Sequence, residues 1–425
     1  MARFLFTMLP ADDLGLPTRL VPIARALADR GHEVAMFNPA PAPSKLIAEA
    51  GLKNLPMPSL PVPVPTFDLV EVSSTWDVEH MFGALYADED YVRGMMAVYV
   101  ELMRDYAPDV VVDSFDLLAC LAARALHLKL TTVLQGNFHP ASRGFLWWQP
   151  ERPATLPSAA AVINKVAAEY GLAPEARCVD RLAGDLCLIV GTPETDPLPS
   201  TADVVYVGPI IWQHGDGALP EWVAEVSRQR PLIWVYSGNP RYAPGVATPI
   251  DSIVVIRAAI AALSDSAAQI VLTTGFQELP QEVDRLPSNF HHAAYVPGPV
   301  MARHCDLMVH HGGHSSVMTS LMAGTPAVII PTITERESNA RRLAALGAGE
   351  VVMPTSGTEG EKMINVAEFR AKVHRVLEEP GYRNSAQQVA ESMRKYGGAQ
   401  EAANRIERFA TASPSDRMRA LGGGV

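Results

Sequence analysis

The chain of 425 residues carries a formal net charge of −11 at pH 7, and 48% of its residues are hydrophobic against 19% that are charged. This length exceeds what one hydrophobic core usually supports, so two domains of roughly 200 residues each are expected. The acidic balance supplies no general attraction for nucleic acid or an anionic membrane surface, and it favours a small-molecule partner.

Cysteine usage and the N-terminus indicate the compartment. The cysteines are widely spaced and form no CxxC pair, which argues against a zinc ribbon or a disulfide framework. The first residues, MARFLFTMLPADD, lack a cleavable small-residue site, and no segment approaches 18 uninterrupted apolar residues. We therefore expect a cytoplasmic protein that is neither secreted nor inserted into a membrane.

The first half of the chain alternates between strand-like and helix-like patterns. RFLFTML predicts a buried strand, TRLVPIARALADRG predicts a helix that stops at Gly31, and HEVAMFN predicts a second strand. A βαβ unit of this kind implies a parallel sheet with right-handed crossovers. The same rhythm returns at PDVVVDS, LLACLAARALHL, KLTTVLQGN and DLCLIVG, so residues 1–211 are predicted to form one doubly wound domain.

Residues 212–230 lose the apolar strand pattern and are predicted to link two domains. A second series of strands and helices begins at PLIWVYSGNP and continues to about residue 410, which predicts a second domain over 231–410 and a tail over 411–425. The fold class is therefore α/β, with two Rossmann-like, doubly wound parallel-sheet domains. Ligands of such sheets collect at the carboxyl ends of the strands, so we expect the site in a cleft that the two domains face.

One junction in the second domain is unusually rich in polar and glycine residues. The stretch DLMVHHGGHSSVMTSLMAG, residues 306–324, predicts a strand, a glycine turn and a helix with Ser315 or Ser316 as its N-cap. Unpaired amides and the positive end of the helix dipole would point at whatever lies above Gly312 and Gly313. The pattern indicates a phosphate or diphosphate site, although a plain strand-to-helix turn would need the same glycines.

The three histidines of HHGGH raise the alternative of a metal site. His310 and His311 are adjacent at a strand end, so their side chains point to opposite sides. Zinc sites also need further ligands that converge from suitable spacing. We therefore expect no metal, and we expect His314 to lie in the loop near the phosphates.

The segment HGGHSS…GTPAVIIPTITERESNARRLAALGAG resembles the donor-binding signature of the family 1 glycosyltransferases, in particular bacterial natural-product and macrolide glycosyltransferases. The resemblance covers nearly the whole chain and implies the two-domain GT-B fold. It implies an inverting, metal-independent hexosyltransferase that moves a sugar from a UDP-sugar or TDP-sugar to a hydroxyl of a hydrophobic small molecule, without a cofactor. The alternatives are a nucleotide-sugar epimerase of the same architecture and a catalytically silent nucleotide-sugar-binding or auxiliary protein. A homodimer is left open.

The resemblance also implies which residues bind the donor. The diphosphate, the sugar and the base are each expected to contact their own group of residues. The sugar is expected to contact Glu335 and Arg336, and the base is expected to contact Tyr295 and Val296. The residues expected to bind the diphosphate are His311, Gly312, Gly313, Ser315, Ser316, Ser237, Gly238 and Asn239.

Three positions depart from the family pattern. Thr319 stands where the family usually has a glutamate that grips the ribose, and Gly298 stands where a glutamine ends the base-stacking loop. Arg336 replaces the glutamine that usually follows the acidic sugar contact. Its guanidinium would bond sugar hydroxyls, pair with a sugar carboxylate, or turn to solvent, and these alternatives stay open.

Transfer to a hydroxyl requires a group that accepts the acceptor's proton. The family usually keeps a histidine in the first N-terminal loop, where this chain has Leu16. Asp12 and Asp13 precede that position, and we expect Asp13, or else Asp12, to be the base, with Asp113 or Asp116 in support. A helix cap or a solvated loop explains the two loop aspartates equally well.

Aromatic and methionine side chains are concentrated in two segments of the first domain, residues 76–106 and 142–150. They suit an apolar acceptor, although a buried helix pair would explain most of those in the first segment. The residues expected to bind the acceptor are Trp76, Phe82, Met95, Phe145, Trp147 and His139. His139 is also the reserve candidate for the base.

Overall fold

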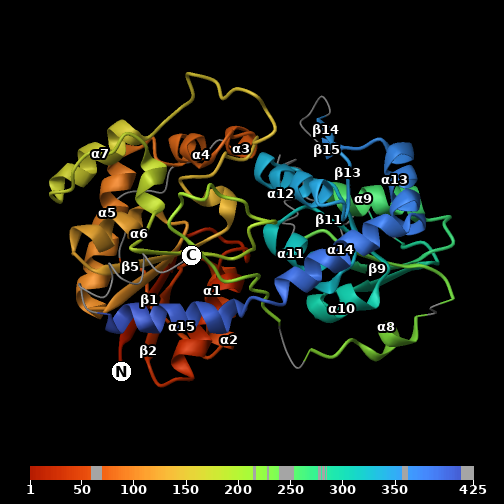
Figure 1. Ribbon diagram of the computed structural model, residues 1–425, viewed down its shortest axis with the longest axis horizontal. Helices are drawn as coiled ribbons and strands as arrows, with labels where there is room; N and C mark the ends of the chain where they lie inside the picture. Colours follow the sequence, from red (N-terminus) through yellow and green to blue (C-terminus); the bar gives the residue numbers. More distant parts are fainter. Residues whose placement is uncertain are drawn as a thin grey trace. The chain divides into compact units, whose positions relative to one another are not determined.

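The computed structural model describes residues 1–58, 69–213, 217–226, 229–238, 253–275, 279, 283, 285–356 and 362–412. The chain divides into two compact units. The first combines the residues before 69 with Thr75–Trp212 and the residues from Tyr396 onward, and the second combines Leu69–Ser74 with Gln213–Lys395. Each unit is built on its own parallel β-sheet (Figure 1).

The sheet of the first unit has seven parallel strands in the order β3-β2-β1-β4-β5-β6-β7. Its central strands are almost wholly buried, as the apolar runs predicted. The strands are β1 (Arg3–Met8), β2 (Glu33–Phe37), β3 (Lys53–Asn54), β4 (Val110–Ser114), β5 (Lys129–Leu134), β6 (Leu186–Ile189) and β7 (Val205–Tyr206).

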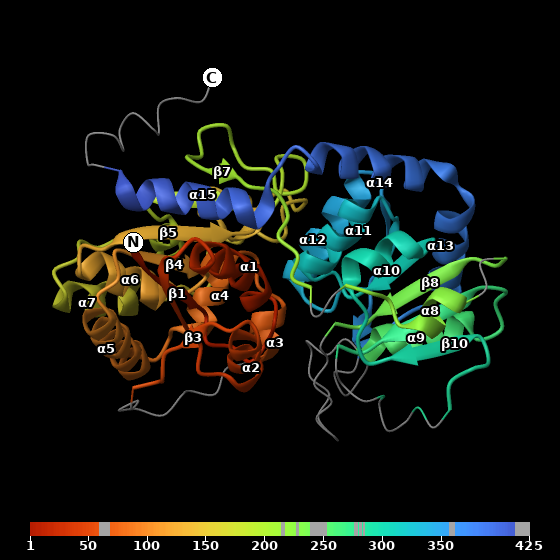
Figure 2. The same cartoon turned by 90° about the horizontal axis from the view of Figure 1, so that it is seen from below.

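Helices cover both faces of this sheet. Figure 2 shows α15 on the opposite side of β5 from α5, α6 and α7. The helices are α1 (Pro17–Ala28), α2 (Pro41–Glu49), α4 (Val78–Leu85), α5 (Glu89–Tyr106), α6 (Leu117–Ala125), α7 (Ala160–Glu169) and α15 (Gly398–Thr411), with short 3-10 turns η1 (Gly136–Phe138) and η2 (Cys178–Leu182).

The sheet of the second unit has six parallel strands in the order β10-β9-β8-β11-β12-β13, and β14 and β15 form a separate antiparallel pair. The strands are β8 (Leu232–Tyr236), β9 (Gln269–Thr273), β10 (Phe290–Ala293), β11 (Leu307–His310), β12 (Ala327–Ile329), β13 (Gly349–Val351), β14 (Thr355–Ser356) and β15 (Lys362–Met363). The strand order reverses direction at β8 and β11, which is the topological position where open parallel sheets bind ligands.

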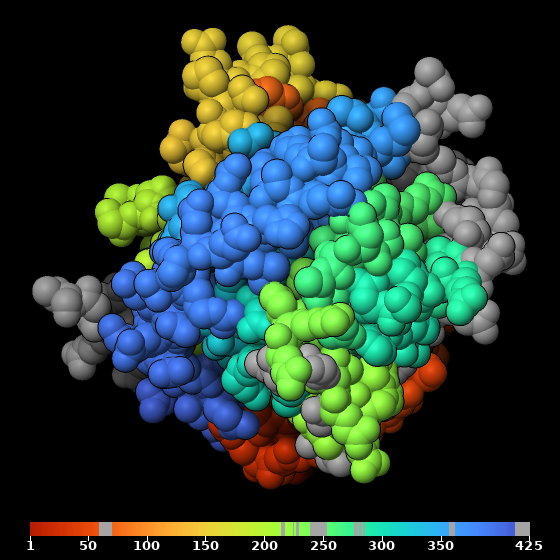
Figure 3. Space-filling view, turned by 90° about the vertical axis from the view of Figure 1, so that its right-hand side faces the viewer, coloured from red at the N-terminus to blue at the C-terminus, as the bar shows by residue number. Residues whose placement is uncertain are grey.

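The helices of the second unit close its core. Side chains of α9 and α13 pack with those of β8, β9 and β11 in one apolar cluster, and Figure 3 shows α13, in blue, next to α9, in green. The helices are α3 (Leu69–Ser73), α8 (Glu221–Glu225), α9 (Ile253–Leu263), α10 (Gly298–His304), α11 (His314–Ala323), α12 (Thr334–Ala345), α13 (Val366–Glu378) and α14 (Pro380–Met393). Among all the helices described, none is both long enough and apolar enough to cross a bilayer.

The structure corrects the predicted C-terminal end of the second domain. Helix α15 packs on α1 of the first unit, although the sequence placed it in the domain that ends at 410. Lys129 Nζ donates to the carbonyl oxygens at the end of α15, at 3.1 Å for Phe409 and 2.6 Å for Ala410. Glu407 on the same helix accepts from His32 at 2.9 Å. Hydrophobic periodicity predicts a helix of this kind, but it does not indicate against which sheet the helix packs.

Candidate active site

The glycine turn before α11 has a backbone that only glycine accommodates. β11 ends at His310 and α11 begins at His314. Gly312 has φ +86°, and a Cβ there would lie 2.8 Å from the carbonyl oxygen of Arg336. The Gly312 N–H donates to Nδ1 of His310 at 3.1 Å. The turn therefore combines a left-handed backbone with a close approach of a second chain segment, and each requires glycine.

The start of α11 differs from the prediction. Gly313 is the N-cap and no side chain caps the helix, so the predicted cap at Ser315 or Ser316 is wrong. Both serines instead lie in the first turn, because the helix begins before them. The C-terminal end agrees with the prediction, since Gly324 closes the helix at φ +69°. An N-terminus without a side-chain cap presents amide groups and the positive end of the helix dipole to a ligand.

His311 lies against two of the predicted donor-loop glycines. A Cβ on Gly238, in the loop after β8, would lie 2.8 Å from His311 Cε1, and a Cβ on Gly313 would lie 2.6 Å from its Nε2. The structure therefore brings together the loop after β8 and the turn after β11, as the sequence predicted. Ser237 is fully buried beside this loop, and Asn239 lies outside the described residues.

The charge state of His311 follows from its surroundings. Burial, then the guanidinium of Arg336, then His310 lower the pKa of His311 well below its usual range. The imidazole is therefore neutral at physiological pH and offers a hydrogen bond without a charge. Across the ranges that the structure describes, no three side chains of His, Cys, Asp or Glu converge in a way that would hold a metal ion.

Tyr236 connects the predicted donor residues, and the sequence analysis missed it. It is the last residue of β8, and its ring meets the ring of His311 edge-on at 5.9 Å. Burial raises its pKa to about 12, with a further increase from Tyr295 and an opposing effect of Arg336. Tyr236, Tyr295, Arg336 and His311 are thus neighbours. Its position in the sequence could have indicated this role. Tyr236 directly precedes Ser237 and Gly238, and it lies two residues after Trp234, on which its ring stacks.

The expected sugar-binding residues lie in the first turn of α12. Glu335 Oε1 accepts a hydrogen bond from Asn339 Nδ2 at 2.7 Å. Arg336 Nη1 donates to Thr332 Oγ1 at 2.6 Å. The guanidinium of Arg336 is therefore bonded to a residue just before its own helix. It also lowers the pKa of His311 and opposes the increase that burial causes in the pKa of Tyr236.

Two of the departures from the family pattern lie side by side. Thr319 Oγ1 donates to the Ser315 carbonyl oxygen at 2.8 Å, and its Cγ2 lies 3.6 Å from the position of a Cβ on Gly298. Trp234 closes the same space at 3.5 Å from that position. A methyl group of Thr319 and the edge of the Trp234 ring thus line the space in front of Gly298.

In the first unit, the two loop aspartates each hold a backbone amide. Asp12 Oδ1 accepts from Ala42 N at 2.7 Å, and Asp13 Oδ1 accepts from Gly15 N at 2.7 Å. Leu16, the N-cap of α1, is buried, and no side chain caps that helix. Asp13 is the more exposed of the two aspartates.

Asp113 is fully buried at the end of β4. Its carboxylate accepts from Thr7 Oγ1 at 2.7 Å and from Asp116 N at 2.9 Å, and Cys120 Sγ lies at 3.4 Å. None of its own hydrogen bonds within the described residues reaches the loop aspartates, and its support of the base stays a prediction. Asp113 faces the start of α6 and the neighbouring strand β1.

Asp116 performs a structural task beside it. Its Oδ1 caps α6 by accepting from Leu118 N at 3.0 Å and Ala119 N at 3.1 Å, and its Oδ2 accepts from the Tyr99 hydroxyl. Burial raises the pKa of Asp116 to about 6, against the hydrogen bond from Tyr99. Burial and the nearby Asp116 raise the pKa of Asp113 well above its usual range. The pair therefore retains protons at pH values where exposed carboxylates are ionised.

Three of the residues predicted to bind the acceptor are core residues. Phe82 and Phe145 have no exposed surface and Met95 is 2% exposed, so the prediction of direct acceptor contact does not hold for them in this structure. Phe82 and Phe145 lie at the two ends of a chain of ring contacts that runs through Phe115 and Phe138. Packing in the core, which the sequence analysis gave as the alternative for most of the first segment, therefore explains these side chains.

Trp76 and Trp147 are partly exposed and remain candidates. The Trp76 carbonyl oxygen accepts from Phe145 N at 2.8 Å, which joins the loop before α4 to the segment after His139. The ring of Trp147 meets that of Trp148 edge-on at 5.5 Å. The two segments that the sequence singled out are thus in contact, with their tryptophans toward the surface and their phenylalanines in the core.

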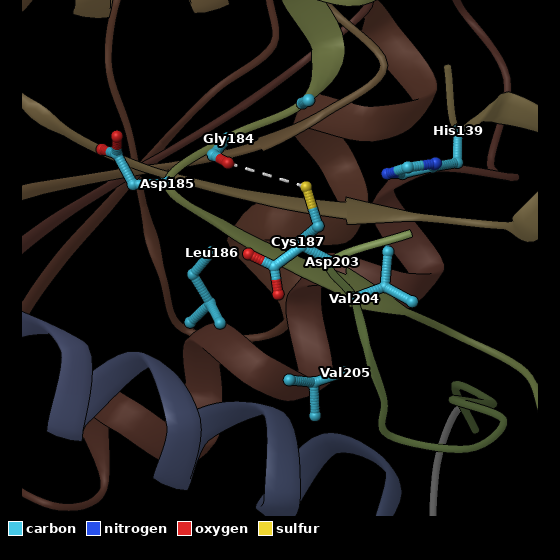
Figure 4. A pocket seen from close by; sticks show the side chains of 9 residues that line it. His139, Gly184, Asp185, Leu186, Cys187, Asp203, Val204 and Val205 are labelled. Carbon is cyan, nitrogen blue, oxygen red and sulfur yellow. Dashed lines mark hydrogen bonds between the residues drawn. The ribbon is translucent and has the colours of Figure 1, made fainter. Parts of the chain in front are cut away.

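His139 lines a cavity of about 290 Å³ with residues 183–187 and 203–205. In Figure 4 its ring lies across from Cys187, whose Sγ donates to the Gly184 carbonyl oxygen. Residues 183–187 and 203–205 belong to the amino-terminal ends of β6 and β7, whereas the loop aspartates follow the carboxyl end of β1. Nδ1 of His139 accepts from Ala141 N at 3.1 Å, and burial lowers its pKa. His139 itself follows β5 and the turn η1, and it stays the reserve candidate for the base.

The two parallel-sheet units match solved glycosyltransferases. The calicheamicin glycosyltransferase CalG4 aligns over 97% of this chain and 100% of its own, with a TM-score of 0.73 at 21% identity. The spinosyn forosaminyltransferase SpnP aligns over the same shares with a TM-score of 0.68 at 22% identity. The fold is GT-B.

Sequence comparison finds similar glycosyltransferases. Residues 257–409 match the family model described as "Erythromycin biosynthesis protein CIII-like, C-terminal domain". The chain is 26% identical over 423 residues to the 3-alpha-mycarosylerythronolide B desosaminyl transferase of Saccharopolyspora erythraea, covering 88% of this chain and 90% of that protein. It is 31% identical over 150 residues to the NDP-glycosyltransferase YjiC of Bacillus licheniformis, where the match spans 36% of the relative's length. Residues 257–409 of the chain are thus similar to the C-terminal domain of the EryCIII-like proteins, and the whole chain is similar in sequence to a macrolide glycosyltransferase.

Proposed function

We propose that this protein transfers a sugar from a UDP-sugar or TDP-sugar to a hydroxyl of an apolar small molecule, with inversion and without a metal ion. The observation that carries the proposal is the cluster in the second unit, where the turn at Gly312, the neutral His311, Tyr295 and Glu335 lie on neighbouring elements. Two structures with the same fold, those of VinC and SsfS6, hold thymidine diphosphate. This supports a nucleoside diphosphate as the ligand of the cluster.

Each part of the cluster suits one part of the donor. The amides at the start of α11, the hydroxyls of Ser315 and Ser316, and a hydrogen bond from neutral His311 would hold the diphosphate, each contributing about 0.3–2 kcal/mol. The base would stack on Tyr295 over the buried Val296. Since His311 is neutral, Arg336 is the neighbouring group that would place positive charge near the diphosphate or the sugar.

The sugar would be read by Glu335, whose carboxylate accepts hydrogen bonds from hydroxyl groups. In the transfer step the acceptor oxygen forms a bond to the anomeric carbon while the bond from that carbon to the diphosphate breaks. The acceptor's proton goes to Asp13, and the nucleoside diphosphate leaves with the electron pair of the broken bond. A single displacement of this kind inverts the anomeric centre.

The proposal is tested by ligand binding and turnover together. Binding of UDP, TDP, GDP and their sugar conjugates should raise the melting temperature, because a ligand that binds only the folded state stabilises it by mass action. Incubation of the stabilising nucleotide sugar with a panel of apolar alcohols should then release the free nucleoside diphosphate at a rate that EDTA leaves unchanged. If no nucleotide stabilises the protein, the proposal fails. If EDTA abolishes release, the metal-independent step fails.

A second candidate is a nucleotide-sugar-binding protein without turnover. It is favoured by one observation, that Leu16 occupies the usual histidine position. Such a protein would show the same thermal stabilisation but release no nucleoside diphosphate in the presence of any acceptor. An epimerase of this architecture would instead convert the sugar without an acceptor.

A further inference from the structure

One side-chain amide joins two parts of the cluster. Asn339 Nδ2 donates to Glu335 Oε1 at 2.7 Å and to the carbonyl oxygen of Gly312 at 3.1 Å. Gly312 belongs to the turn before α11, and Glu335 lies in the first turn of α12. Asn339 is 7% exposed and Gly312 is buried, while Glu335 is partly exposed.

We propose that Asn339 is a positioning residue that fixes the Glu335 carboxylate relative to the diphosphate-binding turn, and thereby makes sugar recognition depend on that turn. The inference rests on the proposed function. The two N–H groups of an amide diverge at a fixed angle, so a carboxylate and a carbonyl bonded to the same nitrogen keep a defined separation. A group that selects among sugar hydroxyls must be held to within about 0.5 Å to be selective.

The backbone around Asn339 supports the same coupling. The Arg336 carbonyl oxygen and Cβ lie 2.8 and 3.3 Å from the position that a Cβ on Gly312 would take, so the start of α12 already abuts the turn. This contact sets the distance between the two segments. The Asn339 amide then directs the Glu335 side chain through the hydrogen bond to its Oε1.

The chemistry of asparagine is required at this position. Alanine would leave the Gly312 carbonyl and the Glu335 carboxylate without this donor, and unmade hydrogen bonds at buried groups are destabilising. Aspartate would place a second carboxylate against Glu335 Oε1 and provide no N–H at all. The order of defects should therefore be N339D greater than N339A.

The test measures what the sugar adds to binding. The sugar increment is defined as the dissociation constant of TDP or UDP divided by that of its sugar conjugate, measured by titration calorimetry over a panel of hexose and deoxyhexose donors. We expect N339A to lower the increment about tenfold, the size expected for loss of one hydrogen bond to a charged group. The affinity for the free nucleoside diphosphate should fall less than about threefold, since Gly312 is held by further contacts.

A double-mutant cycle with Glu335 isolates the positioning role. E335A should lower the increment at least as far as N339A, and the double variant should be no worse than E335A alone, because Asn339 acts through that carboxylate. If Asn339 had only a structural role, the effects of N339A and E335A on the sugar increment would be independent and would add in the double variant.

N289A is the matched control. Asn289 is a buried asparagine of the same unit, 8% exposed, and its Nδ2 donates to the carbonyl oxygens of Leu263 at 2.9 Å and Ala268 at 3.0 Å. Within the part of the chain that the structure describes, the hydrogen bonds of its side chain reach neither the turn nor α12, so N289A should lower the melting temperature as N339A does while the sugar increment stays at the wild-type value.

The outcomes separate this inference from the function on which it rests. If the wild type binds no nucleoside diphosphate, the proposed function fails and the inference fails with it. If diphosphates bind and sugars add affinity, but N339A keeps the wild-type increment or the cycle is additive, Asn339 has no positioning role. If diphosphates bind but no sugar of the panel adds affinity, Glu335 does not read the sugar and the inference is overturned while nucleotide binding stands.

Discussion

The second unit assembles most of the residues that its sequence predicted for donor binding, whereas the first unit scatters its predicted catalytic and acceptor residues. In the second unit, Gly238, His311 and Gly313 come into contact at the carboxyl ends of neighbouring strands. In the first, Asp113 is fully buried, and His139 lines a cavity with residues 183–187 and 203–205. This difference indicates that strand order determines where a site made from backbone turns lies, whereas the position of a site made from side chains depends on packing.

The largest test of this comparison is the catalytic base. Asp13→Asn keeps an oxygen that can accept from the Gly15 N–H but removes the proton acceptor, so turnover should fall about 10²–10⁴-fold, the usual range for loss of a general base. Steady-state release of nucleoside diphosphate measures this. Asp12→Asn, which keeps the analogous bond to Ala42, is the matched control and should stay near the wild-type rate. Full turnover of both variants would rule out the loop aspartates.

The second test concerns the backbone of the donor turn. Gly312→Ala adds a Cβ at φ +86° that would lie 2.8 Å from the Arg336 carbonyl oxygen, so the turn must open. We expect nucleoside diphosphate affinity to fall roughly 100-fold and stability to fall by about 1–3 kcal/mol. Calorimetric titration and denaturant unfolding measure the two effects.

Gly381→Ala provides the control for that variant. Gly381 lies in the first turn of α14, and a Cβ there would meet nothing within 4 Å. Alanine is a better helix former than glycine, so stability should be equal or slightly higher and nucleotide affinity unchanged. Equal behaviour of the two alanine variants would remove the special role of the turn at Gly312.

The sequence predicted the fold and the diphosphate turn because both follow from short-range patterns. Apolar runs identify buried strands, their alternation with helices implies parallel sheets, and Gly312 and Gly313 between a strand and a helix indicate a close approach of the backbone. The predicted N-cap was wrong by two or three residues because Gly313 can adopt the cap conformation without a capping side chain.

The missed residues share a different property. Asn339 and Tyr236 each act between segments that are distant in the sequence, and a single sequence holds no record of such contacts. Phe82 and Phe145 were assigned to an acceptor pocket because an aromatic side chain looks the same in a pocket and in a core. Only packing distinguishes these environments, so residue type alone could not separate the buried phenylalanines from the partly exposed Trp76.

The third test uses pH, because buried titratable groups in the two units have opposite effects. His310 has a pKa lowered to about 3 by burial, so below pH 6.5 the unfolded state binds a proton that the folded state does not, and its contribution to stability falls with falling pH. Asp116 has a pKa raised to about 6, so its folded state keeps a proton that the unfolded state loses above about pH 4. Its contribution is present at low pH and is lost as pH rises through 6.

Substitutions without a titrating group separate these contributions. Between pH 4 and 6.5, H310N should flatten the loss of stability on acidification, and D116N, which retains a cap for α6, should flatten the gain. Each difference should be about 1–3 kcal/mol across the window. Chemical denaturation at half-unit pH intervals measures it. A pH profile that neither substitution alters would mean that the two groups titrate alike in the folded and unfolded chain.

The smallest expected effect tests whether α15 belongs to the first unit in energy as well as in contacts. Lys129 Nζ donates to the carbonyls of Phe409, Ala410 and Ala412 and thus neutralises the negative end of the α15 dipole. Lys129→Met keeps the aliphatic stem and should lower stability by about 1 kcal/mol, while nucleoside diphosphate affinity stays unchanged because every donor residue lies in the other unit. Lys45→Met removes an exposed pair with Glu49 at 3.9 Å and should cost less than about 0.5 kcal/mol. Loss of nucleotide affinity in Lys129→Met would show that the donor cluster depends on the first unit. The two units would then differ only in how well their sites can be predicted from the sequence, and they would not be energetically independent.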